Sequence, residues 1–141
     1  MAPEHDYSHR TTIQKLGVEA GVRLELGGDV GAELRREVKV ALGRGPVRTG
    51  LLDGALVLVH SAEEAEAVLA RLRPRLRDEG YLWLVTRRRG QEGYVNQMDL
   101  IPAARRVGLI DNKTCSIDEQ RSGIRFVVPR ALRGGARQSA A

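Results

Sequence analysis

Residues 55–64 read ALVLVHSAEE, and their pattern is the strongest indication of the fold class. Its first half, Ala55–Val59, is apolar throughout and lacks the apolar–polar alternation of a strand with one solvated face. A short run of this kind is typical of a parallel strand covered on both faces. In its second half Ser61 stands three residues before Glu64, the spacing of a capping box that starts a helix. The stretch therefore predicts a central parallel strand that leads directly into a helix.

The residues that follow predict an amphipathic helix and a return to the sheet. Apolar residues recur at intervals of three and four, at Ala62, Ala65, Val68, Leu69, Leu72 and Leu76. Pro74 has no amide hydrogen and crowds the carbonyl four residues back, so we expect a kink or break near Arg73 and a helix end at Gly80. Residues 81–86 predict a second buried strand, because they are aromatic and β-branched. A helical crossover of this kind is the connection that parallel strands require.

Upstream, the pattern predicts one further strand and one further helix. Residues 21–27 alternate between apolar and polar side chains, as a strand does, with a glycine at each end. Apolar residues at helical spacing predict a helix over Ala32–Leu42, stopped at Gly43. We expect a stub of strand at residues 46–49 and a turn at Asp53-Gly54 before the central strand.

Downstream, the pattern predicts a helix and a hairpin. Asp99 is suited to cap a helix over residues 100–107, which Gly108 ends. Strands near residues 113–117 and 124–128 are joined by a connection short enough for an antiparallel pair. The whole succession predicts an α/β fold, a small three-layer sandwich whose mostly parallel sheet ends in a C-terminal antiparallel hairpin.

The chain length and composition indicate one domain with a basic C-terminal half. The 141 residues carry 23 Lys and Arg against 18 Asp and Glu, a net charge of +5. Residues 1–66 carry net −3 and residues 67–141 net +8, so positive potential should gather on one side. We expect a mobile N-terminal segment at residues 1–12, one α/β domain at residues 13–129 and a mobile, basic tail at residues 130–141.

Three features of the sequence bear on where in the cell the protein is located. No apolar run approaches the roughly 20 residues that span a bilayer. The N-terminal residues lack the basic and apolar regions of a secretion signal. The one cysteine, Cys115, cannot form an internal disulfide. Together these features predict a cytoplasmic protein without a membrane segment.

Several stretches resemble a bacterial family known as domain of unknown function 3052, over about residues 7–128. The most specific are GLIDNKTCSIDE at residues 108–119 and SGIRFV at residues 122–127. The strand order and residues 76–84 also resemble the second half of a class I methyltransferase sheet. The resemblance implies a Rossmann-like fold and no particular reaction or ligand. Arg121 departs from the family, which commonly has Trp there, and VTRR at residues 85–88 replaces its usual Trp-Pro-Lys-Lys.

The stretch ELGGDVG at residues 25–31 resembles the loop with which a methyltransferase binds the amino-acid part of S-adenosylmethionine. On this resemblance the cofactor-binding candidates are Glu25, Gly27 and Gly31. However, Asp29 adds bulk at the middle glycine position, where backbone must approach a ligand closely. Residues 47–49 offer no acid for the ribose hydroxyls, and the connection to the central strand is too short for two more strands and helices. We therefore expect no cofactor, and interpret the glycines as turn residues.

Three residues at the ends of the predicted parallel strands are candidates for a ligand groove: His60, Arg87 and Arg88. In open α/β sheets ligands bind outside the carboxyl ends of the strands. His60 has a local alternative, as a residue flanking a helix cap. Seven arginines among residues 71–89 predict either a solvated surface or a patch for phosphate backbones or an acidic protein. The scarcity of aromatic side chains argues against stacked nucleic-acid bases.

The remaining candidates have structural interpretations. Cys115 is typical of a small apolar filler in a strand, and a nucleophilic role would need its neighbour Lys113 to lower its pKa. Asp118-Glu119 is more typical of turn capping than of an acid/base pair. His5 and His9 have the spacing of a helical metal pair but no helix signal, so we expect no metal site.

The sequence therefore favours a non-catalytic binding or regulatory module on a trimmed methyltransferase-like scaffold. Its expected partner is an acidic protein or a phosphate-bearing ligand, and a homodimer stays open. One alternative is a small S-adenosylmethionine-dependent methyltransferase that uses Glu25, Gly27 and Gly31. A second alternative is a nucleic-acid-binding module that uses the Arg-rich surface.

Overall fold

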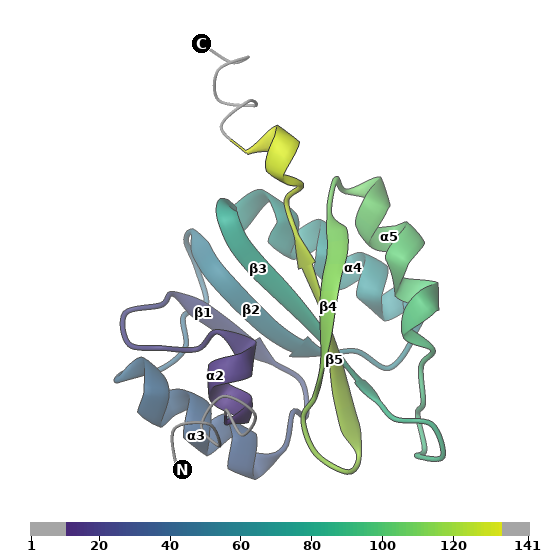
Figure 1. The fold of residues 1–141 in the computed structure, drawn as a ribbon, viewed down its shortest axis with the longest axis horizontal. Helices are drawn as coiled ribbons and strands as arrows, with labels where there is room; N and C mark the ends of the chain where they lie inside the picture. The colour runs from purple at the N-terminus through teal and green to yellow at the C-terminus, as the bar shows by residue number, and fades with distance from the viewer. Residues whose placement is uncertain (1–10, 134–141) are drawn as a thin grey trace, which may run out of the picture.

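A five-stranded sheet runs through the middle of the computed structural model, which describes residues 11–133 (Figure 1). The strand order is β1-β2-β3-β5-β4. The strands are β1 (Leu24–Gly27), β2 (Leu52–Leu58), β3 (Leu76–Arg87), β4 (Ile110–Ser116) and β5 (Arg121–Val127). β1, β2 and β3 are parallel, whereas β5 pairs antiparallel with both β3 and β4. The predicted α/β class, with a parallel part and a C-terminal hairpin, is confirmed.

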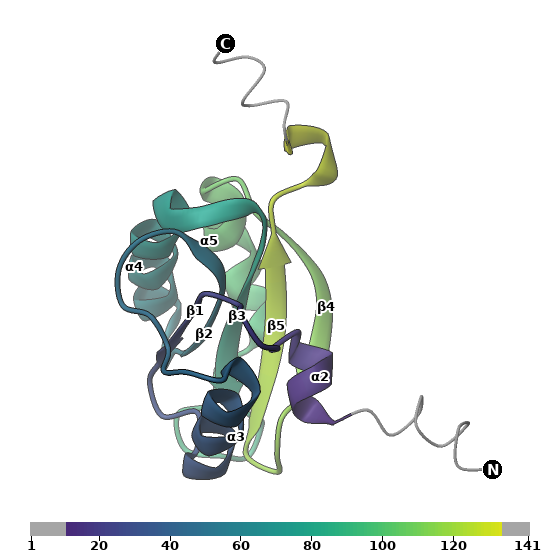
Figure 2. The same ribbon diagram turned by 90° about the vertical axis from the view of Figure 1, so that its left-hand side faces the viewer.

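Helices cover both faces of the sheet and complete three layers (Figure 2). They are α2 (Thr12–Leu16), α3 (Ala32–Leu42), α4 (Ala62–Leu72) and α5 (Ile101–Arg106). Two apolar cores result, one on each face. Leu56 and Leu58 of β2 face α2 and α3, while Ala55 and Val57 face α4 and α5. This alternation of side chains is why one strand contributes to both cores.

The central strand and its helix form as the sequence predicts. β2 lies between β1 and β3 and is parallel to both. Ser61 is the N-cap of α4, and its hydroxyl oxygen accepts a hydrogen bond from the Glu64 amide at 3.0 Å. The Glu64 carboxylate accepts from the amide of His60 at 2.6 Å, one residue before the partner that a capping box predicts. The cap therefore also holds the end of β2.

The helix break at Pro74 is confirmed, but the predicted helix end at Gly80 is wrong. α4 ends at Leu72, a 3-10 turn η1 follows over Arg73–Arg75, and β3 begins at Leu76. Gly80 lies inside β3, where a Cβ would come within 2.9 Å of the Asp53 carbonyl oxygen. The glycine there allows close packing of two strands and does not mark a helix end.

The turn predicted at Asp53-Gly54 is also wrong, because both residues lie within β2. The ring of Tyr81 lies over Gly54, where a Cβ would be only 2.5 Å from the ring. The Asp53 carboxylate accepts from the Arg23 amide at 2.9 Å. The glycine makes room for an aromatic ring on the next strand, a cross-strand contact that local sequence signals do not show.

Helix α2 is an element that no prediction above includes. It begins with a capping box between Thr11 and Gln14, a signal that the sequence does contain. At the other end, the Leu16 carbonyl oxygen accepts a hydrogen bond from Trp83 Nε1 at 2.9 Å. Because the last carbonyls of a helix lack partners within it, this bond helps to attach the short helix to β3.

Two smaller elements differ from the prediction. Residues 46–49 form no strand, although the Val47 amide donates to the Leu24 carbonyl oxygen at 2.8 Å, along the outer edge of β1. Asp99 does not cap α5. Asn96 instead caps a 3-10 turn, η2 (Gln97–Leu100), which leads into α5.

The described elements run from Thr12 to the end of a 3-10 turn, η3 (Arg130–Leu132), slightly beyond the domain predicted at residues 13–129. The mobile segments predicted at the two ends fall mostly on residues 1–10 and 134–141, which lie outside the described residues. Within residues 11–133, every helix is too short or too polar to cross a membrane.

Candidate functional site

The loop between β1 and α3 stands at the carboxyl end of β1. Gly28 has a φ of 76°, and a Cβ there would be 2.8 Å from the Leu58 carbonyl oxygen at the end of β2. Gly31 is the N-cap of α3, with a φ of 100°. Both glycines adopt backbone angles that other residues rarely do. The interpretation of these glycines as turn residues therefore has a geometric basis.

The side chain of Arg121 fills the space against this loop. It is buried, reaches back from β5, and its Nε donates to the Asp29 carbonyl oxygen at 2.9 Å. Its Nη1 donates to Asp118 Oδ2 at 2.9 Å, and its Nη2 lies 3.5 Å from Asp29 Oδ1. A Cβ on Gly31 would be 3.2 Å from Arg121 Nη1. The loop thus packs against a protein guanidinium group.

Asp29 also faces a second arginine, since Arg87 Nη2 lies 3.6 Å from Asp29 Oδ2. The Asp29 side chain is 62% exposed, so these ion pairs are screened by solvent and individually weak. They place the Asp29 carboxylate between side chains of β3 and β5.

The three cofactor-binding candidates do not converge on one point. Gly31 lies against Arg121, and Gly27 lies in β1 against the Val57 side chain. The Glu25 carboxylate points to the α4 side of the sheet, where it forms ion pairs with Arg71 at 2.8 Å and Arg75 at 2.7 Å. Glu25 thus interacts with basic side chains of the protein itself.

His60 and Arg87 both lie near Gly93, whereas the Arg88 side chain is hydrogen-bonded to β4. A methyl group added at Gly93 would be 3.9 Å from His60 Nδ1 and 3.8 Å from Arg87 Cγ. Arg88 donates to the Ser116 hydroxyl oxygen at 2.9 Å, on β4. Both arginines line a shallow hollow of about 300 Å³ beyond the end of β3. His60 does not line this hollow, so the predicted three-residue groove stays a prediction.

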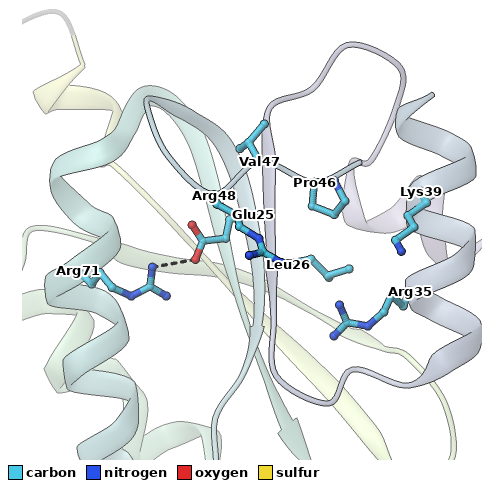
Figure 3. A pocket seen from close by; sticks show the side chains of 8 residues that line it. All are labelled: Glu25, Leu26, Arg35, Lys39, Pro46, Val47, Arg48 and Arg71. Carbon is cyan, nitrogen blue, oxygen red and sulfur yellow. Dashed lines mark hydrogen bonds and ion pairs between the residues drawn. The ribbon is translucent and has the colours of Figure 1, made fainter. Parts of the chain in front are cut away.

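A deeper cleft lies along the outer edge of β1, between α3 and α4 (Figure 3). Its volume is about 470 Å³. Arg35 and Lys39 of α3 stand on one side, and Arg71 of α4 stands on the other (Figure 3). The rest of the lining comes from β1 and the loop before β2: Glu25, Leu26, Pro46, Val47 and Arg48. Four of these eight side chains are basic and one is acidic.

The seven arginines at residues 71–89 do not form one patch. The four at residues 71–77 lie near the start of β3, and the three at residues 87–89 lie at its other end, roughly 30 Å away for a strand of this length. Members of the first group interact with acidic side chains and backbone, for example Arg77 with Asp53 at 3.0 Å. This division favours separate local roles over one continuous surface for nucleic acid.

Cys115 is buried in β4, with 8% of its surface exposed. Burial raises the pKa of its thiol, while Lys15 and Lys113 lower it by less. A raised pKa reduces the thiolate, which is the nucleophilic form. Both properties agree with the predicted role as an apolar filler.

We expect Cys115 in the folded protein to react with iodoacetamide near neutral pH at a rate at least about tenfold lower than that of free cysteine. The reason is that the thiol is both buried and protonated. The rate is measured by mass spectrometry of the alkylated chain. Denatured protein is the control and should react at the rate of free cysteine. A folded-state rate equal to the control would contradict the buried, inert role.

The described residues contain no group of three or more His, Cys, Asp or Glu side chains that could hold a metal ion. His5 and His9, at which we expect no metal site, lie outside residues 11–133. Asp118 caps the turn between β4 and β5, as predicted, because its Oδ1 accepts from the amides of Gln120 and Arg121, both at 2.8 Å.

Two features of these sites could not be located from the sequence. Arg121 was noted only as a departure from a family pattern, and its contact with Asp29 joins residues far apart in the chain. The β1-edge cleft needs three separate segments to meet, around Arg35, Arg48 and Arg71. The excess of basic residues was the only local signal, and it did not indicate which of them share a cleft.

The fold is that of the S-adenosylmethionine-dependent methyltransferases of class I. Such an enzyme from Aquifex aeolicus superposes with a TM-score of 0.64 at 9% identity, covering 82% of this chain and 87% of the other. A precorrin-6y C5,15-methyltransferase from Geobacter metallireducens gives 0.58 at 10% identity, covering 83% and 85%. Fibrillarin from Aeropyrum pernix, in complex with natively bound S-adenosyl-L-methionine, gives 0.53 at 16% identity, covering 85% and 76%. At these identities the likeness concerns the fold alone.

The sequence family gives a narrower assignment of this chain than the fold does. The chain belongs to the family described as "Protein of unknown function (DUF3052)", which matches residues 13–130. The resemblance seen in the sequence is thereby confirmed. A comparison with curated proteins finds no significant match.

Proposed function

We propose that this protein is a non-catalytic binding module, built on a methyltransferase-like scaffold that has no cofactor pocket. The observation that carries the proposal is the position of Arg121. Its guanidinium group lies against Gly31 and donates to the Asp29 carbonyl oxygen at 2.9 Å. The backbone of this loop therefore faces a side chain where the resemblance would place the amino-acid part of S-adenosylmethionine.

The edge position of β1 supports the same proposal. In a doubly wound sheet of order 3-2-1-4-5-6, two further strands lie beyond the first strand and form part of the dinucleotide crevice. Here β1 is outermost, and the connection from β1 to β2 contains one helix, α3. At the place of the missing strands stands Val47-Arg48, without an acid for ribose hydroxyls. The residues present do not fit the adenosine half of the cofactor.

The alternative is a small methyltransferase that uses Glu25, Gly27 and Gly31. It is favoured by the shared fold and by the glycine-rich loop at the carboxyl end of β1. It requires Glu25 and Arg121 to leave the partners described above. The two functions therefore differ in whether the cofactor binds to the folded chain.

Isothermal titration of the full chain with S-adenosylmethionine and with S-adenosylhomocysteine separates the two functions. We expect no saturable heat up to about millimolar ligand, because the loop is filled and the adenosine side is absent. The variant Asp29→Gly is the informative comparison. This variant lacks the bulky side chain but keeps β1 at the edge of the sheet, so we expect it to bind neither S-adenosylmethionine nor S-adenosylhomocysteine. Saturable micromolar binding by the natural chain would overturn the proposal.

A further inference from the structure

Three basic side chains line the β1-edge cleft without an acidic partner among residues 11–133: Arg35, Lys39 and Arg48. Arg35 donates to the Gly28 carbonyl oxygen at 2.6 Å, while the side chains of Lys39 and Arg48 have no hydrogen-bond or ion-pair partner within the described part of the chain. They come from two segments, α3 and the loop before β2, and line one concave space. Like charges gathered in this way repel one another unless an anion lies between them.

The acidic residue of the cleft is already neutralised. Glu25 accepts from Arg71 at 2.8 Å and from Arg75 at 2.7 Å, and its side chain is only 12% exposed. Its charge is thus compensated on the α4 side and does not balance the three cations opposite. The cleft keeps a net positive charge.

Main-chain groups of β1 also face this space. Backbone groups alternate in direction along a strand. The Leu24 carbonyl oxygen points outward and accepts from the Val47 amide at 2.8 Å. The Arg23 carbonyl oxygen points the other way and accepts from the Asp53 amide of β2 at 2.9 Å. By this alternation the amide and carbonyl of Leu26 point outward too. Leu26 lines the cleft, and its outward amide has no partner among the described residues. It is a hydrogen-bond donor beside three cations.

The dimensions of the β1-edge cleft favour a small molecule as its ligand over a peptide strand. A peptide that extended the sheet would need a row of free main-chain groups. β1 has four residues, and the Val47 amide already occupies one of its outward carbonyls. Short, partly covered edges of this kind resist strand addition. A volume of about 470 Å³ lies within the range of small-ligand pockets.

We propose that the β1-edge cleft binds a small phosphate-bearing molecule, held by Arg35, Lys39 and Arg48 with the Leu26 amide. Guanidinium and ammonium groups are the usual protein partners of phosphate oxygens, and the Leu26 amide, which points outward from the sheet into the cleft, adds a directed donor. The inference rests on the proposed function only in treating the chain as a ligand-binding module. It names the chemical class of the ligand and its place.

The test uses inorganic pyrophosphate as the probe, titrated into the isotope-labelled full chain and followed by amide resonances in two-dimensional NMR. We expect saturable shifts centred on Leu26, Val47 and Arg48. The variants Lys39→Glu and Arg48→Glu should each weaken binding by about tenfold or more, since each loses a charge-assisted hydrogen bond and adds repulsion. Arg36→Glu is the matched control, because it makes the same change on α3 at a residue that does not line the cleft. It should change the affinity less than about threefold.

Three results would overturn the inference: no saturable shift with pyrophosphate, equal weakening by Arg36→Glu, or citrate binding as tightly as pyrophosphate. The last would mean that the cleft selects negative charge and not phosphate. Folded spectra of each variant confirm that the exposed substitutions leave the structure intact. None of these outcomes involves S-adenosylmethionine, so failure here is distinct from failure of the proposed function. Conversely, binding of S-adenosylmethionine would contradict the proposed function without deciding whether the β1-edge cleft binds pyrophosphate.

Discussion

The substitution Trp83→Ala is expected to lower the free energy of unfolding by about 3–5 kcal/mol. Trp83 is fully buried on β3, in the core that faces α2 and α3. Truncation removes the ring and leaves a cavity. It also removes the bond from Trp83 Nε1 to the Leu16 carbonyl oxygen, which attaches the end of α2. The loss therefore combines packing with an unpaired helix terminus.

The measurement is urea unfolding followed by circular dichroism, because Trp83 is the only tryptophan and its variants lose the fluorescence signal. Trp83→Phe keeps an aromatic ring and loses the donor, so its cost should be smaller, about 1–3 kcal/mol. Val40→Ala is the control on α3, since Val40 is 78% exposed and should change stability by less than about 0.5 kcal/mol. A cost for Trp83→Ala as small as that of the control would refute the packing described.

The substitution Arg121→Ala is expected to lower the free energy of unfolding by about 1–3 kcal/mol. It leaves the Asp29 carbonyl oxygen without its donor and removes the guanidinium partner of the Asp118 carboxylate, which keeps its bonds to two backbone amides. Both carboxylates are substantially exposed, 62% for Asp29 and 41% for Asp118, so water can solvate them afterwards. This exposure keeps the expected cost below that of breaking a fully buried ion pair.

The contribution of the Asp29 side chain is measured separately. Asp29→Ala keeps the carbonyl that accepts from Arg121, so it should cost less than Arg121→Ala. A double-mutant cycle should give a coupling of less than about 1 kcal/mol between the two side chains. Arg88→Ala is the control at a neighbouring exposed arginine, with an expected cost under about 1 kcal/mol. If Arg121→Ala proved as mild as Arg88→Ala, Arg121 would not be holding the loop.

Trp83 and Arg121 have different parts in the proposed function. Trp83 attaches α2 to the face of the sheet and preserves the scaffold. Arg121 packs against the loop that the resemblance assigns to a cofactor. At the same time the outer edge of β1, which no other strand of residues 11–133 pairs with, borders a basic cleft. The scaffold, the filled loop and the open edge are thus separate features, and each can be tested by its own substitutions.

Local patterns predicted much of the fold. Ala55–Val59 indicated the central parallel strand because its apolar run needs cover on both faces, and Ala32–Leu42 gave the bounds of α3 from helical spacing alone. Pro74 predicted the break after α4, since its missing amide acts within one turn. Gly80 and Gly54 misled the prediction, because these glycines accommodate atoms of other strands and do not form turns.

Residues close together in the chain were sufficient to predict the order and kind of most elements, the α/β class and the family resemblance. The contacts of Arg121 with Asp29 and of Glu25 with Arg71, and the cleft that Arg35 and Arg48 share, depend instead on the packed fold. Such contacts join residues on different elements. Their existence depends on how strands and helices pack, and no local period or spacing records that packing.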